Sequence, residues 1–581
     1  MKNFKVDTYF STFESGNHTF LHENGKTWQK YVIVDNKVIG EYREYHSNGT
    51  LMKRGVFSNG LQQGLWSVYH DNGELWKEIY YKDGKLHGHC IVYLTDKNRA
   101  TEGEFKNDKQ HGKWSYWHDN SNRDKVGTYT NGQQTGKWTY YYDDTNTKWY
   151  EVEYKDGKKN GSYINWHKEN NKVSHTGTYV GGLESGLWEY YNSTGLKYEW
   201  GSFKVGLRNG VWTTRFPNKK NQGKGLYVSG KKEGLWTYWY KNGQKSVEVT
   251  FKDGKWNGLA TYWDKKGIKT TSGNLQTKNE INEKFDMDTD KVKDSHHGIW
   301  TNWYENGVKE SETTYVHGKL SGLYVQFYDD GTKSWQGTYK NHKKVGKWNS
   351  WHPSGKKRAE VIYKNGILNG NQIYYTTDGE VWKQGKNINN KLEGKWVHYH
   401  ENGKKSLEAE YKKGNFDGEY KVWFHTGQFD ERGFYKNDKK YGEWEFWHIN
   451  GTRRKTIVYK NDKLVSEKKW DDTEHKVYIL NYKNGKLDNN STHWYKNGEV
   501  KSHRMYKNGK LNGKYIDNHF IGKKLSSGTM KDNKMHGKWT FWYHNGQKEC
   551  EVICENGKLI DGTVWDDDGN VKESIRFNYK R

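Results

Sequence analysis

The chain has 581 residues, of which 32% are hydrophobic and 16% aromatic, and its mean hydropathy is −1.23. So little aliphatic material excludes several thick globular cores, and so many rings exclude a plainly disordered chain. Lys and Arg number 96 against 71 Asp and Glu, and the resulting net charge of +25 favours acidic partners. No long stretch has the apolar spacing of a helix.

A glycine recurs along the chain with a period of 24 residues. It falls at Gly40, Gly64, Gly88, Gly112 and Gly136, slips by a residue at Gly161 and Gly186, and continues at Gly210, Gly234, Gly258, Gly298, Gly322, Gly346, Gly370, Gly394, Gly418, Gly442, Gly513, Gly537 and near Gly562. A fixed period of this length is the signature of a repeat protein, and it predicts about 23 units. The units near Ser466 and Asn489 lack the opening glycine, so we expect a less regular structure there.

Each unit carries two turn signals between short aromatic or β-branched runs. An Asn-Gly pair predicts a hairpin in which both turn residues take positive φ. It occurs at Asn72-Gly73, Asn242-Gly243, Asn306-Gly307, Asn402-Gly403, Asn497-Gly498 and Asn545-Gly546. About eleven residues later comes Lys-Asp-Gly or Lys-Asn-Gly, as at Asp83-Gly84, Asp156-Gly157, Asp253-Gly254, Asn365-Gly366 and Asn508-Gly509.

Two strands and two turns per unit predict an all-β fold, namely an elongated, single-layer antiparallel sheet. It is a β-meander of tandem hairpin repeats of about 24 residues each, with about 46 strands. At ~4.8 Å per strand the sheet is a rod on the order of 200 Å long. We expect repeats over residues 1–278 and 295–581, separated by a charged insert loop at 279–294.

Aromatic residues follow the opening glycine at fixed offsets. Two places after it stand Trp66, Trp114, Trp138, Trp188, Trp236, Trp300, Trp348, Trp396, Trp444 and Trp539, and five places after it stand Trp117, Trp239, Trp351 and Trp447. We interpret them as structural aromatics that supply buried area in a thin sheet. Stacking of sugars or bases on these rings is the secondary interpretation.

Three sets of residues could bind a metal, and each has a simpler explanation. Asp286, Asp288 and Asp290 in the insert suggest a calcium loop, but Lys291 and His297 stand where the EF-hand needs Gly and Glu. A row of histidines at the sixth offset comprises His46, His70, His118, His167, His352, His400, His448 and His519. These are mostly not in adjacent units, and Cys550 and Cys554 lack a second cysteine pair, so we expect no metal.

Lysines recur beside the second turn. They are Lys82, Lys85, Lys155, Lys158, Lys252, Lys255, Lys364, Lys507 and Lys510. Because they are periodic, they should line one edge of the sheet as a candidate basic row that attracts anions. Lysines also guard exposed turns and edge strands, and that is the alternative role.

The segments GKWSYWHDN (112–120), GLWTYWYKNGQK (234–245), YKDGKLHG (81–88) and GKWTFWYHNGQKECEVICENGKL (537–559) resemble MORN repeats of the bacterial variant type. The resemblance covers nearly the whole chain. It implies a twisted antiparallel sheet used for protein interaction, scaffolding or attachment to acidic membrane lipids. Some members of the variant branch resemble antitoxins. Enzymes of the family carry a separate catalytic domain, for which no segment remains.

We therefore predict a non-catalytic repeat scaffold that mediates protein–protein interaction. An antitoxin or immunity-like protein and a peripheral binder of anionic membrane lipid are the alternatives. We expect a protein partner and not nucleic acid, and exposed sheet edges offer a route to self-association. We expect no cofactor, since the Gly-Lys-Thr at 25–27 has Phe20 where a phosphate loop needs Gly. The absence of a secretion signal and of a transmembrane span predicts a cytoplasmic location.

Overall fold

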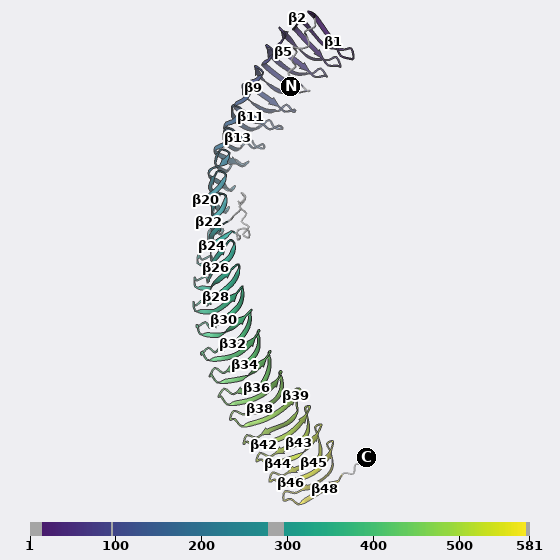
Figure 1. The fold of residues 1–581 in the computed structure, drawn as a ribbon, viewed down its shortest axis with the longest axis vertical. Coiled ribbons are helices and arrows are strands. Elements are labelled where there is room, and N and C mark those ends of the chain that lie inside the picture. The colour runs from purple at the N-terminus through teal and green to yellow at the C-terminus, as the bar shows by residue number, and fades with distance from the viewer. Residues whose placement is uncertain (1–13, 95–96, 277–294, 577–581) are drawn as a thin grey trace. The chain divides into compact units, whose positions relative to one another are not determined.

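The computed structural model describes residues 14–94, 97–276 and 295–576, and in these ranges it contains strands and no helix. The chain divides into two compact units, Met1–Ser295 and His296–Arg581. Within each unit, successive strands pair antiparallel in the order of the sequence, apart from two strands that are interrupted as described below (Figure 1). The prediction of an all-β antiparallel meander of hairpins is thereby confirmed.

The strands of the first unit are β1 (Gly16–Leu21), β2 (Thr27–Val34), β3 (Lys37–Tyr45), β4 (Leu51–Ser58), β5 (Leu61–Tyr69), β6 (Leu75–Lys82), β7 (Lys85–Tyr93), β8 (Arg99–Lys106), β9 (Lys109–Trp117), β10 (Arg123–Thr130), β11 (Gln133–Tyr141), β12 (Lys148–Lys155), β13 (Lys158–Trp166), β14 (Val173–Val180), β15 (Leu183–Tyr191), β16 (Lys197–Lys204), β17 (Leu207–Arg208), β18 (Gly210–Arg215), β19 (Asn221–Val228), β20 (Lys231–Trp239), β21 (Lys245–Lys252), β22 (Lys255–Trp263) and β23 (Lys269–Gln276).

Those of the second unit are β24 (His296–Trp303), β25 (Lys309–Val316), β26 (Lys319–Phe327), β27 (Lys333–Lys340), β28 (Lys343–Trp351), β29 (Lys357–Lys364), β30 (Ile367–Tyr375), β31 (Val381–Ile388), β32 (Lys391–Tyr399), β33 (Lys405–Lys412), β34 (Asn415–Trp423), β35 (Phe429–Lys436), β36 (Lys439–Trp447), β37 (Arg453–Lys460), β38 (Lys463–Trp470), β39 (Lys476–Lys483), β40 (Lys486–Leu487), β41 (Asn489–Trp494), β42 (Val500–Lys507), β43 (Lys510–Asn518), β44 (Lys524–Lys531), β45 (Lys534–Trp542), β46 (Lys548–Glu555), β47 (Lys558–Trp565) and β48 (Val571–Arg576).

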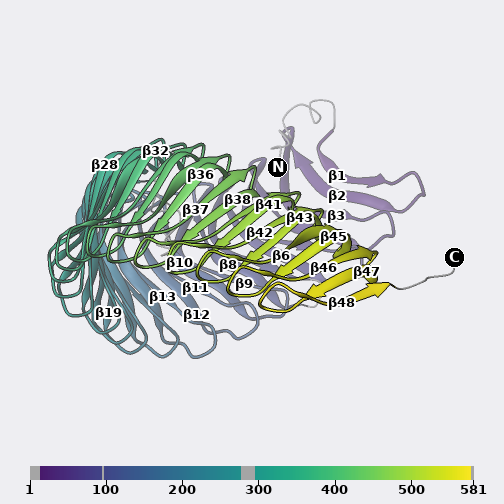
Figure 2. The same ribbon diagram turned by 90° about the horizontal axis from the view of Figure 1, so that it is seen from below.

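Short connections of two kinds alternate along the sheet, so each kind gathers at its own edge (Figure 2). The Lys-Asp-Gly and Lys-Asn-Gly signals form two-residue turns with positive φ at both residues, as at Asp83 (50°) and Gly84 (72°). The Asn-Gly signals lie instead in longer loops, where Gly73 has positive φ (86°) and Asn72 does not. The prediction that both residues of each Asn-Gly pair take positive φ was therefore wrong.

The asparagine of the longer loop serves by its side chain rather than by its backbone. Asn242 Oδ1 accepts a hydrogen bond from the Gln244 amide (3.0 Å), which closes its own loop. Asn242 Nδ2 donates to the Lys265 carbonyl in the next repeat (2.6 Å). Competition of this side chain with backbone groups is what favours Asn in turns, and here it also joins two repeats.

The sheet is interrupted at two places, and one of them lacks the opening glycine. β40 and β41 are parts of one strand interrupted at Asp488, and β17 and β18 are interrupted at Asn209 in the same way although Gly210 is present, so the described residues form 48 strand segments where about 46 strands were predicted. Asn489 takes the place of the glycine with a φ of 69°, a left-handed conformation that Asn tolerates. The irregularity expected near Asn489 is thus confirmed.

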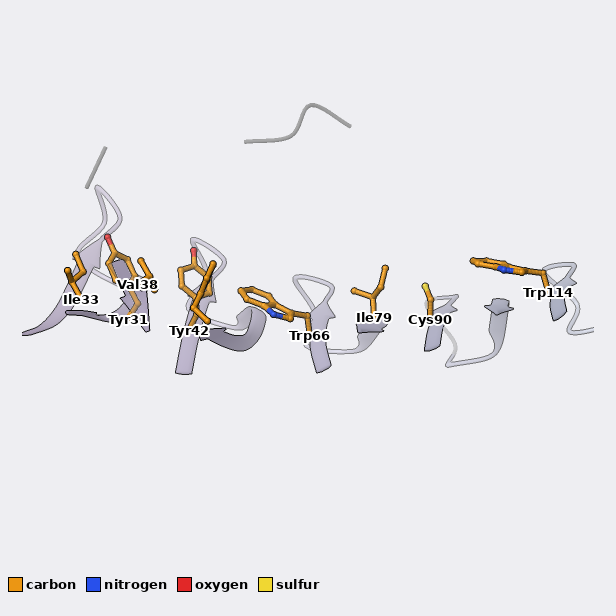
Figure 3. Packing of buried hydrophobic residues seen from close by; sticks show 9 residues of the cluster. Tyr31, Ile33, Val38, Tyr42, Trp66, Ile79, Cys90 and Trp114 are labelled. Atoms are coloured by element: carbon orange, nitrogen blue, oxygen red, sulfur yellow. The ribbon is translucent and has the colours of Figure 1, made fainter. Parts of the chain in front are cut away.

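Large aromatic side chains form the core on one face of the sheet, which we call the aromatic face. Figure 3 shows this packing for Tyr42, Trp66, Ile79, Cys90 and Trp114 of the first unit. The ten tryptophans predicted to be structural are all buried, with 0% to 5% of their surface exposed. A single layer can bury such rings because each indole lies flat along the sheet rather than standing on it.

A glycine eleven residues before the tryptophan makes that flat position possible. A Cβ on Gly127 would lie 2.0 Å from the Trp138 ring, and one on Gly225 would lie 2.1 Å from the Trp236 ring. The indole nitrogen then reaches a backbone carbonyl, as in Trp138 to Thr128 (3.1 Å). Glycine is required here for the close approach of a ring and not for its backbone freedom.

Repeats without this glycine have a smaller residue at the tryptophan position. Among the opposed pairs are Ile79 with Cys90, Val152 with Tyr163, Val249 with Ala260, Val361 with Gln372, and Ala409 with Tyr420. In these five pairs a larger residue on one strand accompanies a smaller one on the next, as close packing demands.

Candidate interaction surfaces

Packing accounts for the main row of tryptophans on the aromatic face. Trp236 makes an edge-to-face contact with Tyr227 at 5.0 Å between ring centroids, and Lys232 Nζ lies 4.6 Å from its ring centroid. Lys440 covers Trp444 in the same way at 3.9 Å, and burial lowers the pKa of this lysine. Some of the lysine side chains therefore lie over aromatic rings on the sheet surface, where the ammonium group is attracted to the ring face.

The opposite face carries the second row of aromatics, which includes Trp117, Trp239, Trp351 and Trp447, because successive residues of a strand point to opposite sides. Carboxylates on this face lie between two lysines. Glu408 contacts Lys395 at 2.9 Å and Lys405 at 2.6 Å. Burial opposes ionisation of Glu408, but the hydrogen bonds from the two lysines outweigh it, and the pKa of this carboxyl lies below its usual value.

The same arrangement recurs around Glu151, Glu360 and Glu551, each of which contacts two lysines. Hydrogen bonds from Lys347 and Lys357 hold the pKa of Glu360 below its ordinary value, in spite of some burial. In these repeats the opposite face is thus polar, and each carboxylate with its two lysines leaves one net positive charge.

One part of the opposite face in the first unit is apolar instead. Leu187, Val211, Leu235 and Leu259 occupy the position directly after the opening glycine in successive repeats, and 54% to 57% of each side chain is exposed. We call these four residues the aliphatic stripe. Leu226 pairs directly with Val211 and widens it.

The aliphatic stripe is a local feature and not a requirement of the repeat. In the first unit the same position holds Glu41, His89, Lys113 and Lys137, and in the second unit it holds Lys347, Lys395 and Glu443. In the second unit Ile299 and Leu323 also occupy it, exposed. Exposed apolar residues that follow one another on one face usually mark a binding surface. The sequence contains this signal, and the search for catalytic and charged groups missed it.

The predicted basic row lies at the edge formed by the two-residue turns. Eight of its nine lysines are exposed, and Lys255 is half-buried. In most of these turns two lysines stand directly opposite each other, as Lys82 with Lys85, Lys155 with Lys158, Lys252 with Lys255, and Lys507 with Lys510, whereas Lys364 opposes Ile367.

Such pairs occupy five successive turns of the second unit, which we call the lysine edge. They are Lys436 with Lys439, Lys460 with Lys463, Lys483 with Lys486, Lys507 with Lys510, and Lys531 with Lys534. Among the described residues, one lysine of this edge is in an ion pair, Lys510 with Asp532 at 3.9 Å. Like charges directly opposite on a sheet are destabilising, so the lysine edge is not explained by stability.

Half of the histidine row joins neighbouring repeats by hydrogen bonds. Nε2 of His400 donates to the Trp423 carbonyl (2.8 Å), and His46 and His167 reach the corresponding carbonyls of Tyr69 and Tyr191. Tyrosine hydroxyls at the same offset make the same bond, for example Tyr240 to Trp263 (2.9 Å). His352 bonds at 3.4 Å, and Nε2 of His70, His118, His448 and His519 has no hydrogen-bond partner in the described chain.

The remaining candidates show no reactive arrangement in the parts of the chain that the structure describes. These parts contain no cluster of three or more His, Cys, Asp or Glu residues placed to hold a metal. Burial raises the pKa of the Cys90 thiol to about 11 and raises the pKa values of Cys550 and Cys554. Asp286, Asp288 and Asp290, for which the calcium site was predicted, lie outside the described ranges, and so does the whole insert at 279–294.

A family model supplies the identification. The model described as MORN repeat variant matches residues 39–59, 62–83, 232–253, 297–317, 344–365, 392–413, 487–508 and 535–553. The chain carries MORN repeats. Each of the eight matched segments contains a longer loop with residues of the two strands that flank it, and ends at or before the first residue of a two-residue turn, so the hairpins closed by these longer loops are the repeats that the family model matches.

A comparison with curated proteins finds no match. Among solved structures, a crystal structure of TcdB2-TccC3-TEV aligns over 96% of this chain with 10% identity and a TM-score of 0.13. A structure of the Photorhabdus luminescens Tc holotoxin pore aligns over 95% with 10% identity and a TM-score of 0.11. Each alignment covers 34% of the longer chain, so this chain spans about a third of their length. TM-scores this low do not establish a shared fold.

Over the ranges that the structure describes, no helix has the length and the apolar character that crossing a bilayer requires.

Proposed function

We propose that this MORN-repeat protein is a non-catalytic scaffold that binds a protein partner through the aliphatic stripe. The supporting observation is the exposure of Leu187, Val211, Leu235 and Leu259 on a face where other repeats carry charges. Apolar side chains gain free energy when a partner removes them from water, about 25 cal/mol for each Å² buried.

The dimensions of the aliphatic stripe suit a partner of ordinary size. From β15 to β22 the four residues extend over ~30 Å, at about 4.8 Å per strand. A standard interface buries about 800 Å² on each partner, with an apolar centre and a polar rim. Glu189, Lys224 and Glu248 lie on the same face and supply such a rim. The partner should therefore present an apolar surface of its own.

The test is affinity capture from native extract, followed by measurement of binding between the purified proteins. The triple variant Leu187→Lys, Leu235→Lys and Leu259→Lys should lose the partner, because three charges cannot be buried without compensation. It should remain folded, since Lys113 and Lys137 occupy the same position in other repeats. The matched control is Lys113→Ala, which alters the same position outside the aliphatic stripe.

Unchanged affinity of the purified partner for the triple variant would contradict the proposal. Sedimentation analysis of the wild-type protein separates binding of a different protein from self-association. If the aliphatic stripe joins copies of this chain, the sedimentation coefficient rises with concentration and the triple variant abolishes that rise. The antitoxin alternative has no supporting observation in the structure and stays a prediction.

A second candidate function is attachment to an anionic lipid surface, and the lysine edge favours it. Ten lysines in five opposed pairs repel one another unless an anionic surface neutralises them. Binding to anionic vesicles should fall steeply between low and physiological salt, because exposed charges are screened beyond about 8 to 10 Å. Equal binding to neutral vesicles would show that the lysines serve solubility alone.

A further inference from the structure

A groove of about 1110 Å³ opens on the aromatic face of the second unit, over β27 to β32 and the loops that follow them. Its lining includes Trp335, Ser350, Arg358, Tyr374 and Trp382. Most of the aromatic face is closed by packed rings, so the groove needs a local cause.

The cause is a repeat with three departures from the pattern. Gln372 stands where other repeats have tryptophan, so no indole covers this part of the face. Thr376 stands where His352 and His400 reach the next repeat, and its side chain is too short for that bond. Asp378 replaces the asparagine whose amide would also bridge to the next loop, and a carboxylate cannot donate.

The floor of the groove is made of small residues between two rings. Ser350 pairs with Ala359, and these two lie between Trp335 on one side and Tyr374 on the other, each on an adjacent strand. Ser350 and Ala359 are 1% and 5% exposed, so the open part of the groove lies above them, between the partly exposed rings of Trp335 and Tyr374.

Buried polar groups in and beside this floor lack hydrogen-bond partners among the described residues. Ser350 lines the groove and is 1% exposed, and its Oγ has no such partner. Beside the groove, Gln372 is 0% exposed; its Nε2 donates to the Gly370 carbonyl (3.1 Å), but its Oε1 is unpartnered. Ser334 Oγ is also buried without a partner. Buried polar groups are nearly always satisfied, so the hydroxyl of Ser350 points to a ligand that supplies the missing bond.

Two cations of the lining are available to an anion. Arg358 is exposed and forms no ion pair with any residue that the structure describes. Lys383 lies 4.3 Å from the ring centroid of Trp382 and 5.0 Å from that of Tyr374, also without a carboxylate partner. Glu401 is the acidic residue of the lining and is exposed. Arg454 occupies the same repeat position as Arg358, and it is paired at 4.0 Å with Asp430, which stands at that position in the preceding repeat. In the repeat that precedes Arg358, the same position holds Ser334, which offers no carboxylate.

We propose that this groove binds a small anion that carries a flat aromatic ring, such as a nucleotide or an aromatic carboxylate. The ring stacks between Trp335 and Tyr374, and the anionic group reaches Arg358 and Lys383. Stacking of a ring on aromatic side chains and charge-assisted hydrogen bonds from a guanidinium are the two interactions that the lining provides.

The test is isothermal titration calorimetry on the full chain with four probes. Adenosine monophosphate and indole-3-acetate carry a ring and an anion, adenosine carries the ring alone, and inorganic phosphate carries the anion alone. At least one ring-bearing anion should bind more tightly than adenosine and phosphate. If adenosine monophosphate binds and indole-3-acetate does not, the ligand is an organic phosphate. If indole-3-acetate binds and adenosine monophosphate does not, the ligand is an aromatic carboxylate.

Variants locate the site. Arg358→Ala should weaken binding by about tenfold to a hundredfold, as expected for the loss of one charge-assisted hydrogen bond. Arg454→Ala, the matched control, should leave the affinity unchanged. Ala359→Leu should abolish binding because it places a larger side chain in the groove, and circular dichroism checks that the variant folds. The proposal is overturned if neither ring-bearing anion binds, if adenosine binds equally well, or if the two arginine variants have the same effect.

Discussion

Two stretches of the protein build the same frame and present different surfaces. In the stretch from β15 to β22, rings such as Trp188, Trp212 and Trp236 fill the aromatic face, and the opposite face exposes the aliphatic stripe. In the stretch from β27 to β33, the aromatic face is hollowed between Trp335 and Tyr374, and the opposite face carries Lys–Glu–Lys groups. The hydrogen-bonded ladders and turns are alike, so the surfaces vary independently of the frame.

The largest expected effect comes from removing a ring of the filled stretch. Trp236→Ala should lower the local free energy of unfolding by about 3–5 kcal/mol, because the buried indole also bonds to the Leu226 carbonyl (3.0 Å). Native-state hydrogen exchange resolves the effect repeat by repeat, which a single unfolding temperature cannot do. Trp149→Ala is the control, since 44% of that ring is exposed. Equal losses in both variants would show that burial of Trp236 has no special role.

A second experiment converts one stretch toward the other. Gly225→Val alone should destabilise by about 1–3 kcal/mol through overpacking, because its Cβ would meet the Trp236 ring. Trp236→Gln in the Gly225→Val background recreates the Val361–Gln372 pair, so the double variant should be more stable than the sum of the single effects predicts. A double-mutant cycle in hydrogen exchange measures the coupling. Additivity within about 0.5 kcal/mol would refute mutual fitting of the pair.

A third experiment restores a missing hydrogen bond between two repeats of the stretch from β27 to β33. Thr376→His should let the ring donate to the Tyr399 carbonyl, as His352 does to Tyr375 and His400 to Trp423. One such bond should add about 0.5–1.5 kcal/mol to the local stability and slow exchange in the loops that follow β30 and β32. Thr377→His places the same ring at an offset that makes no tie. Protection that rises equally in both variants would exclude the specific bond.

The smallest effect concerns acid, on the face opposite the groove. The pKa of Glu408 is lowered in the folded chain, so its ionised form stabilises the fold above the unfolded pKa of about 4.3. That contribution is lost as the pH falls through the lowered folded pKa. Glu408→Gln should therefore remove about 1 kcal/mol or less near neutral pH, because the lysines are half-exposed, and this loss should shrink as the pH falls below about 4.3. A difference in stability that does not change on acidification would contradict the assignment.

Periodicity made the frame predictable, because each strand, turn and buried ring repeats at a fixed offset. The glycine beneath each indole also recurs in the sequence, but its role follows only from the contact between Gly225 and Trp236. The turn types were assigned incorrectly, because Asn-Gly is compatible with both a two-residue turn and a longer loop. The groove could not be predicted, since it arises where Gln372, Thr376 and Asp378 depart from the pattern together. The exposed aliphatic positions were readable in the sequence once the opposite face was considered separately.

The pairing of each strand with its successor has a consequence for how the protein forms. Contacts within a unit join residues close in sequence, as in the register of β25 with β26. Chains with such low contact order fold quickly, and a hairpin can close without waiting for distant segments. During synthesis, each completed hairpin can dock on the one before it while the ribosome is still adding residues. By the same logic, loss or duplication of a whole 24-residue segment leaves every remaining strand with a partner, so the length of such a chain can change in steps of one hairpin.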